Sequence, residues 1–245
     1  MVASSDYNGD GTADIAVFRP SSGMWSVRNL TEAYYGTASD QAAPGDYDGD
    51  GSADISVFRG SSGEWFIREK SRFSFGSSGD IAVPKDYDGD GIDDIAVFRP
   101  STGLWNVRNI TSAGFGLSGD WPVPADYDGA GSSRIAVYRP AGGLWAVLGL
   151  TRFNFGTSPD WPAPLDYDGD GVSEAAIFRP CTVLWAIRGQ TREYFGSCPD
   201  WPCPADYDGD GMDDLAIFRD YSSLWAIRDL PRVWFGLTND IPVTR

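Results

Sequence analysis

The chain contains no histidine, and this absence removes much of the chemistry of familiar enzymes. Without an imidazole it cannot form a Ser-His-Asp triad, move protons through histidine, or hold a histidine-ligated zinc, iron or copper ion. Only five glutamates are present, and no G-x-S-x-G nucleophile motif occurs. We therefore expect that the protein is not an enzyme.

The chain also lacks long hydrophobic runs and an excess of basic residues. No apolar segment approaches the roughly 20 residues that a membrane-spanning helix needs, and the N-terminus lacks the charged and apolar regions of a signal peptide. We interpret the sequence as a mature fragment. The 19 Lys and Arg against 35 Asp and Glu give a formal charge of −16, which would repel a phosphate backbone or an anionic bilayer. Neither nucleic-acid binding nor membrane insertion is expected.

A repeat of 40 residues fills the chain. Its 245 residues, 42% of them hydrophobic and 14% aromatic, are enough to build the core of a single domain over residues 1–245. The repeats span 1–40, 41–80, 81–120, 121–160, 161–200 and 201–240. Residues 241–245 occupy the same repeat positions as 1–5, so they close or overlap the first strand. Pro242-Val243 matches the other repeats better, but the sequence leaves open which terminus completes that strand.

Each repeat contains four short segments that we interpret as strands separated by turns. Examples are residues 122–126 before an acidic loop, 95–98 after one, 104–108, and 153–156 ending on an aromatic-Gly pair. The second segment is apolar at every position, which indicates that both of its faces are covered. A 40-residue, four-stranded unit covered on both sides is typical of a propeller blade. The sequence therefore predicts an all-β, six-bladed β-propeller with an acidic loop between the first and second strands of each blade.

The acidic loop has the pattern D-x-[DN]-x-D-G-x-x-[DE], which places oxygen side chains at positions 1, 3, 5 and 9. Calcium accepts six to eight oxygen ligands with flexible geometry, and a glycine at position 6 permits the sharp turn around an ion. Position 12, where an EF-hand needs a bidentate glutamate, is valine or isoleucine in every repeat. The loop is therefore predicted to be a calcium site of another kind.

Five repeats keep all four oxygen positions, and we predict one Ca²⁺ in each. The predicted ligands are Asp6, Asn8, Asp10 and Asp14; Asp46, Asp48, Asp50 and Asp54; Asp86, Asp88, Asp90 and Asp94; Asp166, Asp168, Asp170 and Glu174; and Asp206, Asp208, Asp210 and Asp214. Five such ions would change the formal charge from −16 to about −6. Because carboxylates fill the coordination positions, the predicted role of the metal is structural.

The fourth repeat departs from this pattern. It keeps Asp126 and Asp128, but position 5 is Ala130 and position 9 is Arg134. Two lost carboxylates and one added cation should abolish metal binding. We expect the Arg134 guanidinium to lie near Asp126 and Asp128 and to supply positive charge in place of the ion.

Repeats of this acidic loop, followed by Ile-Ala-Val-Phe-Arg and later by Phe-Gly, resemble the FG-GAP/VCBS repeats of integrin α-subunit propellers and of many bacterial secreted and surface proteins. The resemblance covers the whole chain. It implies blades with calcium-binding loops and an extracellular or cell-surface location, as in secreted bacterial proteins. The functions it implies are adhesion, protein binding or sugar binding.

Other residues recur at fixed repeat positions. We expect the tryptophans at 25, 65, 105, 145, 185 and 225 to form the blade cores, and the arginines at 19, 59, 99, 139, 179 and 219 to donate hydrogen bonds between blades. The aspartates at 40, 80, 120, 160, 200 and 240 open each link between blades, where turn capping is expected. Among the three cysteines, a bridge between Cys181 and Cys198 and free buried thiols are both open, and Cys203 is left over.

Three links between blades carry an additional tryptophan in an Asp-Trp-Pro sequence, at Trp121, Trp161 and Trp201. Such a ring could stack on a sugar or anchor a protein loop, or it could pack between blades or line the mouth of the channel. The sequence favours a non-catalytic, lectin-like binding module for a glycan or another cell-surface ligand. The alternative is a protein-binding adhesion scaffold or a structural spacer within a larger secreted or surface protein. Exposure of these three rings would distinguish a sugar-binding role from packing.

Overall fold

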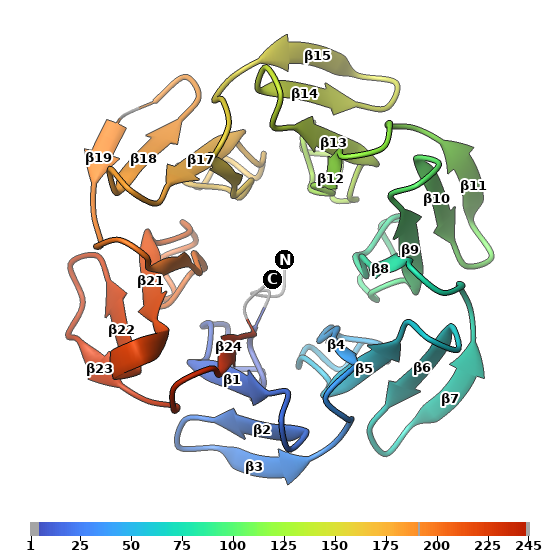
Figure 1. The fold of residues 1–245 in the computed structure, drawn as a ribbon, viewed down its shortest axis with the longest axis horizontal. Helices are drawn as coiled ribbons and strands as arrows, with labels where there is room; N and C mark the ends of the chain where they lie inside the picture. The colour runs from blue at the N-terminus through green and yellow to red at the C-terminus, as the bar shows by residue number, and fades with distance from the viewer. Residues whose placement is uncertain (1–4, 191, 244–245) are drawn as a thin grey trace. The chain divides into compact units, whose positions relative to one another are not determined.

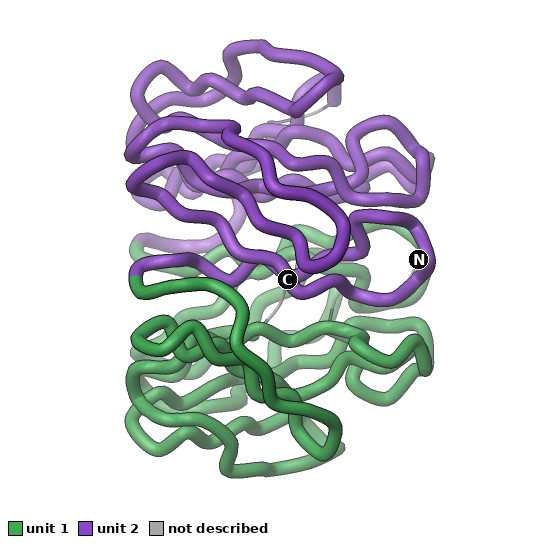
Figure 2. Tube along the Cα trace, turned by 90° about the vertical axis from the view of Figure 1, so that its right-hand side faces the viewer, with its two compact units in different colours: residues 1–78, 199–245 green, residues 79–198 purple. Residues whose placement is uncertain are grey.

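The computed structural model describes residues 5–190 and 192–243. These residues form six four-stranded antiparallel sheets, so the chain is an all-β six-bladed β-propeller, as predicted (Figure 1). It divides into two compact units, one of residues 1–78 and 199–245 and the other of residues 79–198, shown in different colours in Figure 2. Within the described residues, no helix has both the length and the apolar character needed to cross a membrane. The single domain over residues 1–245 stays a prediction.

The first unit contains three blades. The strands of blade 1 are β24 (Ile241–Pro242), β1 (Ala16–Arg19), β2 (Met24–Val27) and β3 (Thr31–Tyr34). Those of blade 2 are β4 (Gln41–Ala42), β5 (Ser56–Arg59), β6 (Glu64–Ile67) and β7 (Ser71–Ser74). Those of blade 6 are β20 (Trp201–Pro202), β21 (Ala216–Arg219), β22 (Leu224–Ile227) and β23 (Val233–Trp234), with the short 3-10 helix η1 (Asp220–Ser222) between β21 and β22.

The second unit contains blades 3 to 5. The strands of blade 3 are β8 (Ile81–Ala82), β9 (Ala96–Arg99), β10 (Leu104–Val107) and β11 (Thr111–Gly114). Those of blade 4 are β12 (Trp121–Pro122), β13 (Ala136–Arg139), β14 (Leu144–Val147) and β15 (Thr151–Asn154). Those of blade 5 are β16 (Trp161–Pro162), β17 (Ala176–Arg179), β18 (Leu184–Ile187) and β19 (Arg192–Tyr194).

The C-terminal end of the chain completes blade 1. Strand β24 pairs antiparallel with β1, with Pro242 opposite Val17 and Ile241 opposite Phe18. This pairing decides between the two copies of the first strand that the sequence left open. Residues 1–4 and 244–245 lie outside the described residues.

The repeated tryptophans form the blade cores, as expected. All six are fully buried, and each indole N–H donates to the backbone carbonyl ten residues later, over 2.9 to 3.2 Å. In blade 5, the Trp185 ring lies against Phe178 of the neighbouring strand with a centroid distance of 4.9 Å. A buried indole with its N–H satisfied contributes a large apolar surface without leaving a polar group unpaired.

The repeated arginines and link aspartates form buried ion pairs. Each arginine donates two hydrogen bonds to one aspartate through Nε and Nη2, over 2.6 to 2.9 Å, and every one of these carboxylates is fully buried. In the link into blade 2, Asp40 Oδ2 also accepts from the Thr37 backbone N–H at 2.9 Å. Turn capping by the aspartates is thereby confirmed. Each arginine therefore ties the second strand of its blade to the link that enters the same blade.

The outer strand of each blade ends earlier than the sequence indicated, before the aromatic-Gly pair. In blade 4 the expected segment 153–156 is replaced by β15, which ends at Asn154. Phe155 leaves the ladder because its N–H donates to the Gly143 carbonyl, and Gly156 has a φ of +88°, outside extended geometry. The innermost strand is also shorter than residues 122–126: β12 covers Trp121–Pro122, and Ala125 pairs with Arg134 only as an isolated bridge.

Candidate metal centre and link tryptophans

The acidic loops lie between the first and second strands of the blades, and the aspartate at position 1 organises each of them. In blade 5, Asp166 Oδ1 accepts from the Gly169 N–H at 2.7 Å and Oδ2 accepts from the Gly171 N–H at 2.8 Å. Both glycines have positive φ, which lets these N–H groups point inward. At position 9, Glu174 Oε2 accepts from the Tyr167 N–H at 2.9 Å. The backbone therefore aims the carboxylates at one another.

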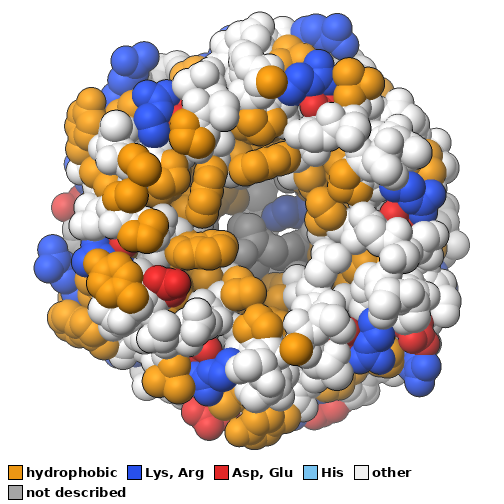
Figure 3. Space-filling model, viewed as in Figure 1, with side chains coloured by type: hydrophobic (Ala, Val, Ile, Leu, Met, Phe, Trp, Pro, Cys, Tyr) orange, Lys and Arg blue, Asp and Glu red, His pale blue; other side chains and the backbone are white. Residues whose placement is uncertain are grey.

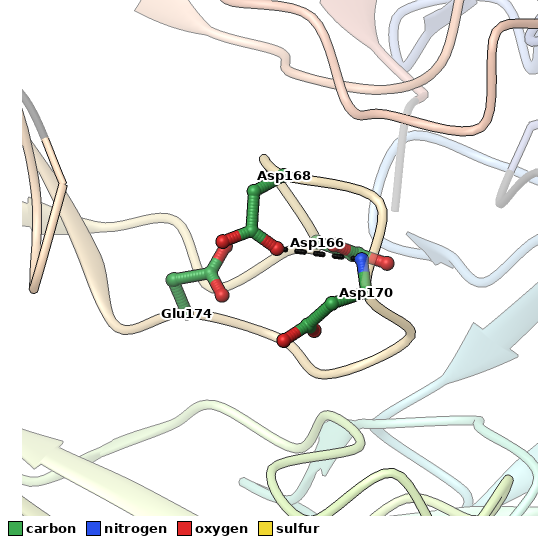
Figure 4. A group of neighbouring side chains, drawn as sticks. All are labelled: Asp166, Asp168, Asp170 and Glu174. Atoms are coloured by element: carbon green, nitrogen blue, oxygen red, sulfur yellow. Dashed lines mark hydrogen bonds between the residues drawn. The ribbon is translucent and has the colours of Figure 1, made fainter.

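Loop 5, residues 166–174, is the most complete oxygen cluster. Oxygen atoms of Asp166, Asp168, Asp170 and Glu174 all lie within 4.8 Å of one another (Figure 4). Two oxygens that each lie 2.3 to 2.6 Å from one Ca²⁺ are at most about 5 Å apart, so this spacing fits such an ion. Sharing one divalent cation would also relieve the repulsion among four carboxylates.

The other loops gather fewer of the predicted ligands. Loops 2, 3 and 6 bring positions 1, 3 and 5 within 4.8 Å, namely Asp46, Asp48 and Asp50; Asp86, Asp88 and Asp90; and Asp206, Asp208 and Asp210. The position 9 residues Asp54, Asp94 and Asp214 are not part of these groups. In loop 1, Asp6, Asp10 and Asp14 form no such group among the described residues, and the Asn8 amide donates to Asp14 at 3.3 Å.

Burial and repulsion between neighbouring carboxylates shift the pKa of two position 9 carboxyl groups. Burial, together with the neighbouring carboxylates of the same loop, raises the pKa of Asp94 and of Asp214 to about 6. A carboxyl group whose pKa is raised in this way is destabilised in its ionised form, and a cation would stabilise it. The donor set consists of hard oxygen atoms, the type of ligand that Ca²⁺ prefers, and loop 5 also has all four of its predicted ligands at a spacing that fits one ion.

Two of the loops contain a protein cation. In loop 4, the Arg134 guanidinium donates to both Asp128 oxygens, with the shortest contact 2.7 Å from Nη2 to Oδ2. Its hydrogen bond lowers the pKa of Asp128. The predicted Arg134–Asp128 contact is therefore present, while Asp126 accepts backbone N–H groups instead. In loop 2, the Lys70 ammonium contacts two of the predicted ligands, an interaction that the loop sequence did not reveal.

The loops of neighbouring blades are joined within each unit. The Asp6 carbonyl accepts from the Ala53 N–H at 2.6 Å in the first unit, and the Asp126 carbonyl accepts from the Ser173 N–H at 2.6 Å in the second. Gly129 lies so close to loop 5 that a Cβ there would be 3.2 Å from a Val172 methyl group. Each of these loops therefore contacts the loop of a neighbouring blade in the same unit.

The link tryptophans differ in exposure. Trp121 is 41% exposed and Trp201 is 42% exposed, whereas Trp161 is half-buried. Trp121 contacts the buried Tyr138 edge-on, with a centroid distance of 6.5 Å. Trp121 and Trp201 are therefore partly exposed and partly packed, and their role in binding or in packing stays a prediction. The face seen in Figure 3 carries many hydrophobic and few acidic side chains.

A groove beside loop 1 was not foreseen from the sequence. Its volume is about 490 Å³, and its lining combines polar groups of Asp14, Arg28 and Asn29 with the apolar side chains of Leu30 and Leu230. All of these residues belong to the first unit.

Two cysteines meet at one end of blade 5. The Sγ atoms of Cys181 and Cys198 are 3.4 Å apart and both residues are exposed, whereas Cys203 is buried. The fifth repeat is the only one that has cysteine at both of these repeat positions. The first repeat, for example, has Ser21 and Ala38 there. Burial raises the pKa of the Cys203 thiol, so that thiol is a poor nucleophile.

Treatment with oxidised glutathione is therefore expected to join Cys181 to Cys198 and to leave Cys203 reduced. Intact mass should fall by two hydrogens, and titration of the unfolded protein should find one free thiol in place of three. The variant Cys203→Ser should behave in the same way, apart from its missing thiol. A mixed disulfide that includes Cys203, or three thiols after oxidation, would contradict the expected pairing.

Comparison with known proteins agrees with the repeat and the fold. Residues 2–39 match the family model of the FG-GAP repeat. No curated protein matches the chain in sequence. Two kinds of solved structure are similar in fold, both below 20% identity.

One is a lectin from Agrocybe aegerita, described as recognising non-reducing terminal N-acetylglucosamine. It is 19% identical with a TM-score of 0.54, and the match covers 95% of this chain and 78% of the lectin chain. The other is BBS1N in complex with ARL6DN, 10% identical with a TM-score of 0.55, covering 90% of this chain and 76% of that one. The chain is therefore a six-bladed β-propeller whose first repeat matches the FG-GAP repeat, and the same 40-residue pattern recurs in its other five blades.

Proposed function

We propose that this protein is a non-catalytic, calcium-stabilised binding module that recognises a glycan outside the cell. The observation that carries the proposal is the exposure of Trp121 and Trp201, at 41% and 42%, each followed by a proline that restricts the link. A partly exposed, rigidly held indole can stack on the apolar face of a sugar ring at a low cost in side-chain entropy.

The surroundings of these rings support a weak, repeated type of site. Trp121 and Trp201 occupy the same position in two blades, and sites repeated on one molecule gain affinity for a multivalent ligand. The fold is shared with a lectin that recognises a terminal sugar. Extracellular calcium-binding modules use oxygen-ligand loops, so the proposed location is extracellular or at a cell surface.

The second candidate function is protein binding by an adhesion scaffold. It is favoured by other exposed hydrophobic residues, among them Leu117 at 60% and Tyr221 at 58%. The similar fold of BBS1N was solved in a complex with a protein. In this alternative, the tryptophans would anchor a partner loop and no free sugar would bind.

A glycan array with the calcium-loaded protein tests the proposal. We expect binding to a defined sugar, weakened about tenfold or more by Trp121→Ala or Trp201→Ala, since each loses a stacking contact of about 1.4 kcal/mol. Trp234→Ala is the matched control, because that ring is 67% exposed on strand β23 and lies outside the links. Absence of glycan binding by well-folded protein, or equal loss in the Trp234 variant, would overturn the proposed sugar recognition.

A further inference from the structure

Lys70 places a positive charge inside the acidic loop of blade 2. The residue lies in the turn between β6 and β7, and its Nζ is 2.5 Å from Asp48 Oδ2 and 2.7 Å from Asp54 Oδ1. Only 26% of the lysine side chain and 14% of the Asp54 side chain are exposed. The ammonium therefore bridges loop positions 3 and 9, which are two of the four predicted metal ligands.

No other intact loop receives a charge from this repeat position. The equivalent residues in the remaining repeats are Leu30, Ile110, Leu150, Gln190 and Leu230. Gln190 donates one hydrogen bond to Asp168 at 2.9 Å, but an amide adds no charge. Lys70 is one of only two lysines in the chain, and it contacts carboxylates from two ends of the same loop. Loop 2 thus differs from loops 1, 3, 5 and 6 by a cation that comes from another turn of its own blade.

The ammonium and a calcium ion compete for the same oxygen atoms. A Ca²⁺ ligated by Asp48 and Asp54 would lie 2.3 to 2.6 Å from those oxygens, a distance close to the one at which Nζ lies. Two cations cannot share that position, because they would repel each other at contact distance. The lysine is tethered to the blade, so it is always present at high local concentration.

Loop 4 also contains a protein cation, which a different residue supplies. There the guanidinium of Arg134 contacts Asp128 at position 3, after the loop has lost its carboxylates at positions 5 and 9. Loop 2 retains Asp46, Asp48, Asp50 and Asp54, so its own sequence is that of a metal loop.

We propose that Lys70 is the resident cation of loop 2, so that blade 2 keeps its loop ordered without a divalent ion and binds calcium far more weakly than loops 1, 3, 5 and 6. Five loops have complete ligand sets, and loop 2 is one of them. Leaving out loop 2, where Lys70 lies, gives four strong sites. This count rests on the proposed calcium function, whereas the stabilising role of Lys70 does not.

The test compares wild type with Lys70→Met, which keeps the length of the side chain and removes its charge. Calcium bound per chain is measured by equilibrium dialysis, and Tm is measured in EGTA. We expect four ions for the wild type and five for Lys70→Met. We also expect a lower Tm for Lys70→Met in EGTA, because loop 2 then has no cation, with recovery when calcium is added. Arg72→Met is the matched control, since its side chain is 66% exposed on the same blade, and it should bind four ions.

The outcomes separate the inference from the proposed function. Five ions in the wild type, or an unchanged Tm of Lys70→Met in EGTA, would overturn the role of Lys70. If the wild type binds no calcium, the proposed calcium function fails, and the Tm in EGTA alone decides on Lys70. Should Lys70→Met not fold, Lys70→Arg keeps the inference testable: it should retain the wild-type Tm in EGTA and four ions, and a fifth ion there would contradict the inference.

Discussion

Substituting Asp40 with asparagine is expected to lower the free energy of unfolding by about 3 kcal/mol, the low end for breaking a buried ion pair. The Asp40 side chain is fully buried and receives two hydrogen bonds from Arg59, at 2.8 Å each, and one from the Thr37 N–H. The asparagine amide would place an N–H group against N–H donors of Arg59 and Thr37, and it carries no negative charge. The partly buried Arg59 guanidinium would therefore lose the charge that balances its own. For a chain of this size, Tm should fall by roughly 6 to 12 °C in thermal unfolding.

The control is Glu69→Gln, the same chemical change in an exposed ion pair. Glu69 is 78% exposed and contacts Arg68 at 3.0 Å, so its loss should change stability by about 0.5 kcal/mol or less. The pH dependence gives a second check. Burial tends to raise the pKa of Asp40, but the hydrogen bonds from Arg59 and Thr37 lower it below its usual value. Its contribution is therefore present above about pH 4 and is lost as the pH falls through its lowered pKa. Equal destabilisation by the two variants would contradict the structural role of the buried pairs.

Removal of calcium is expected to have the largest effect of all. An ion held at a hundredfold its dissociation constant stabilises the fold by about 2.7 kcal/mol, so four sites together contribute on the order of 10 kcal/mol. Addition of EGTA should lower Tm by about 20 °C or more. Loop position 3 provides a matched pair of variants: Asp168→Asn should reduce the calcium-dependent rise in Tm, whereas Asp128→Asn in loop 4 should leave that rise unchanged, because Arg134 replaces the ion there. A Tm that does not respond to EGTA would contradict the proposal.

The effect of calcium removal should depend on pH. The pKa of Asp94 and of Asp214 is raised to about 6 in the folded protein, above the ordinary value of 3.8. The folded state therefore binds more protons than the unfolded state between those values, and metal-free protein gains stability as the pH falls through about 6. In EGTA, Tm should be higher at about pH 5 than at about pH 7.5, and calcium should reverse or flatten that difference.

Much of the fold could be predicted because the sequence repeats its structural residues at a fixed period. The burial of Trp185, the hydrogen-bond donation by Arg59 and the turn capping by Asp40 were predicted from positions that recur in all six repeats. The pairing of Arg59 with Asp40 was found only in the structure. Strand ends were less predictable, because they depend on hydrogen bonds that no periodicity encodes. The N–H of Phe155, for example, donates outside the ladder to Gly143.

The candidate site could be predicted only as far as single loops. The ligand pattern is local, so loop 4 and its Arg134 could be recognised from the sequence. Lys70 could not, because it lies 16 residues after Asp54, and only the folded blade brings its ammonium to the loop. The available signal was a polar residue at a repeat position that is aliphatic in four other repeats. The difference in exposure between Trp161 and Trp201 likewise depends on their neighbours in space and not on the shared Asp-Trp-Pro sequence.

An anomalous difference map from crystals grown with calcium tests the central claim, that cations hold the acidic loops of this propeller. The expected map has one peak in each of loops 1, 3, 5 and 6, between the carboxylates of positions 1, 3, 5 and 9. It has none in loop 2, where Lys70 lies between Asp48 and Asp54, and none in loop 4, where Arg134 contacts Asp128. A map without peaks in loops 1, 3, 5 and 6 would contradict the account.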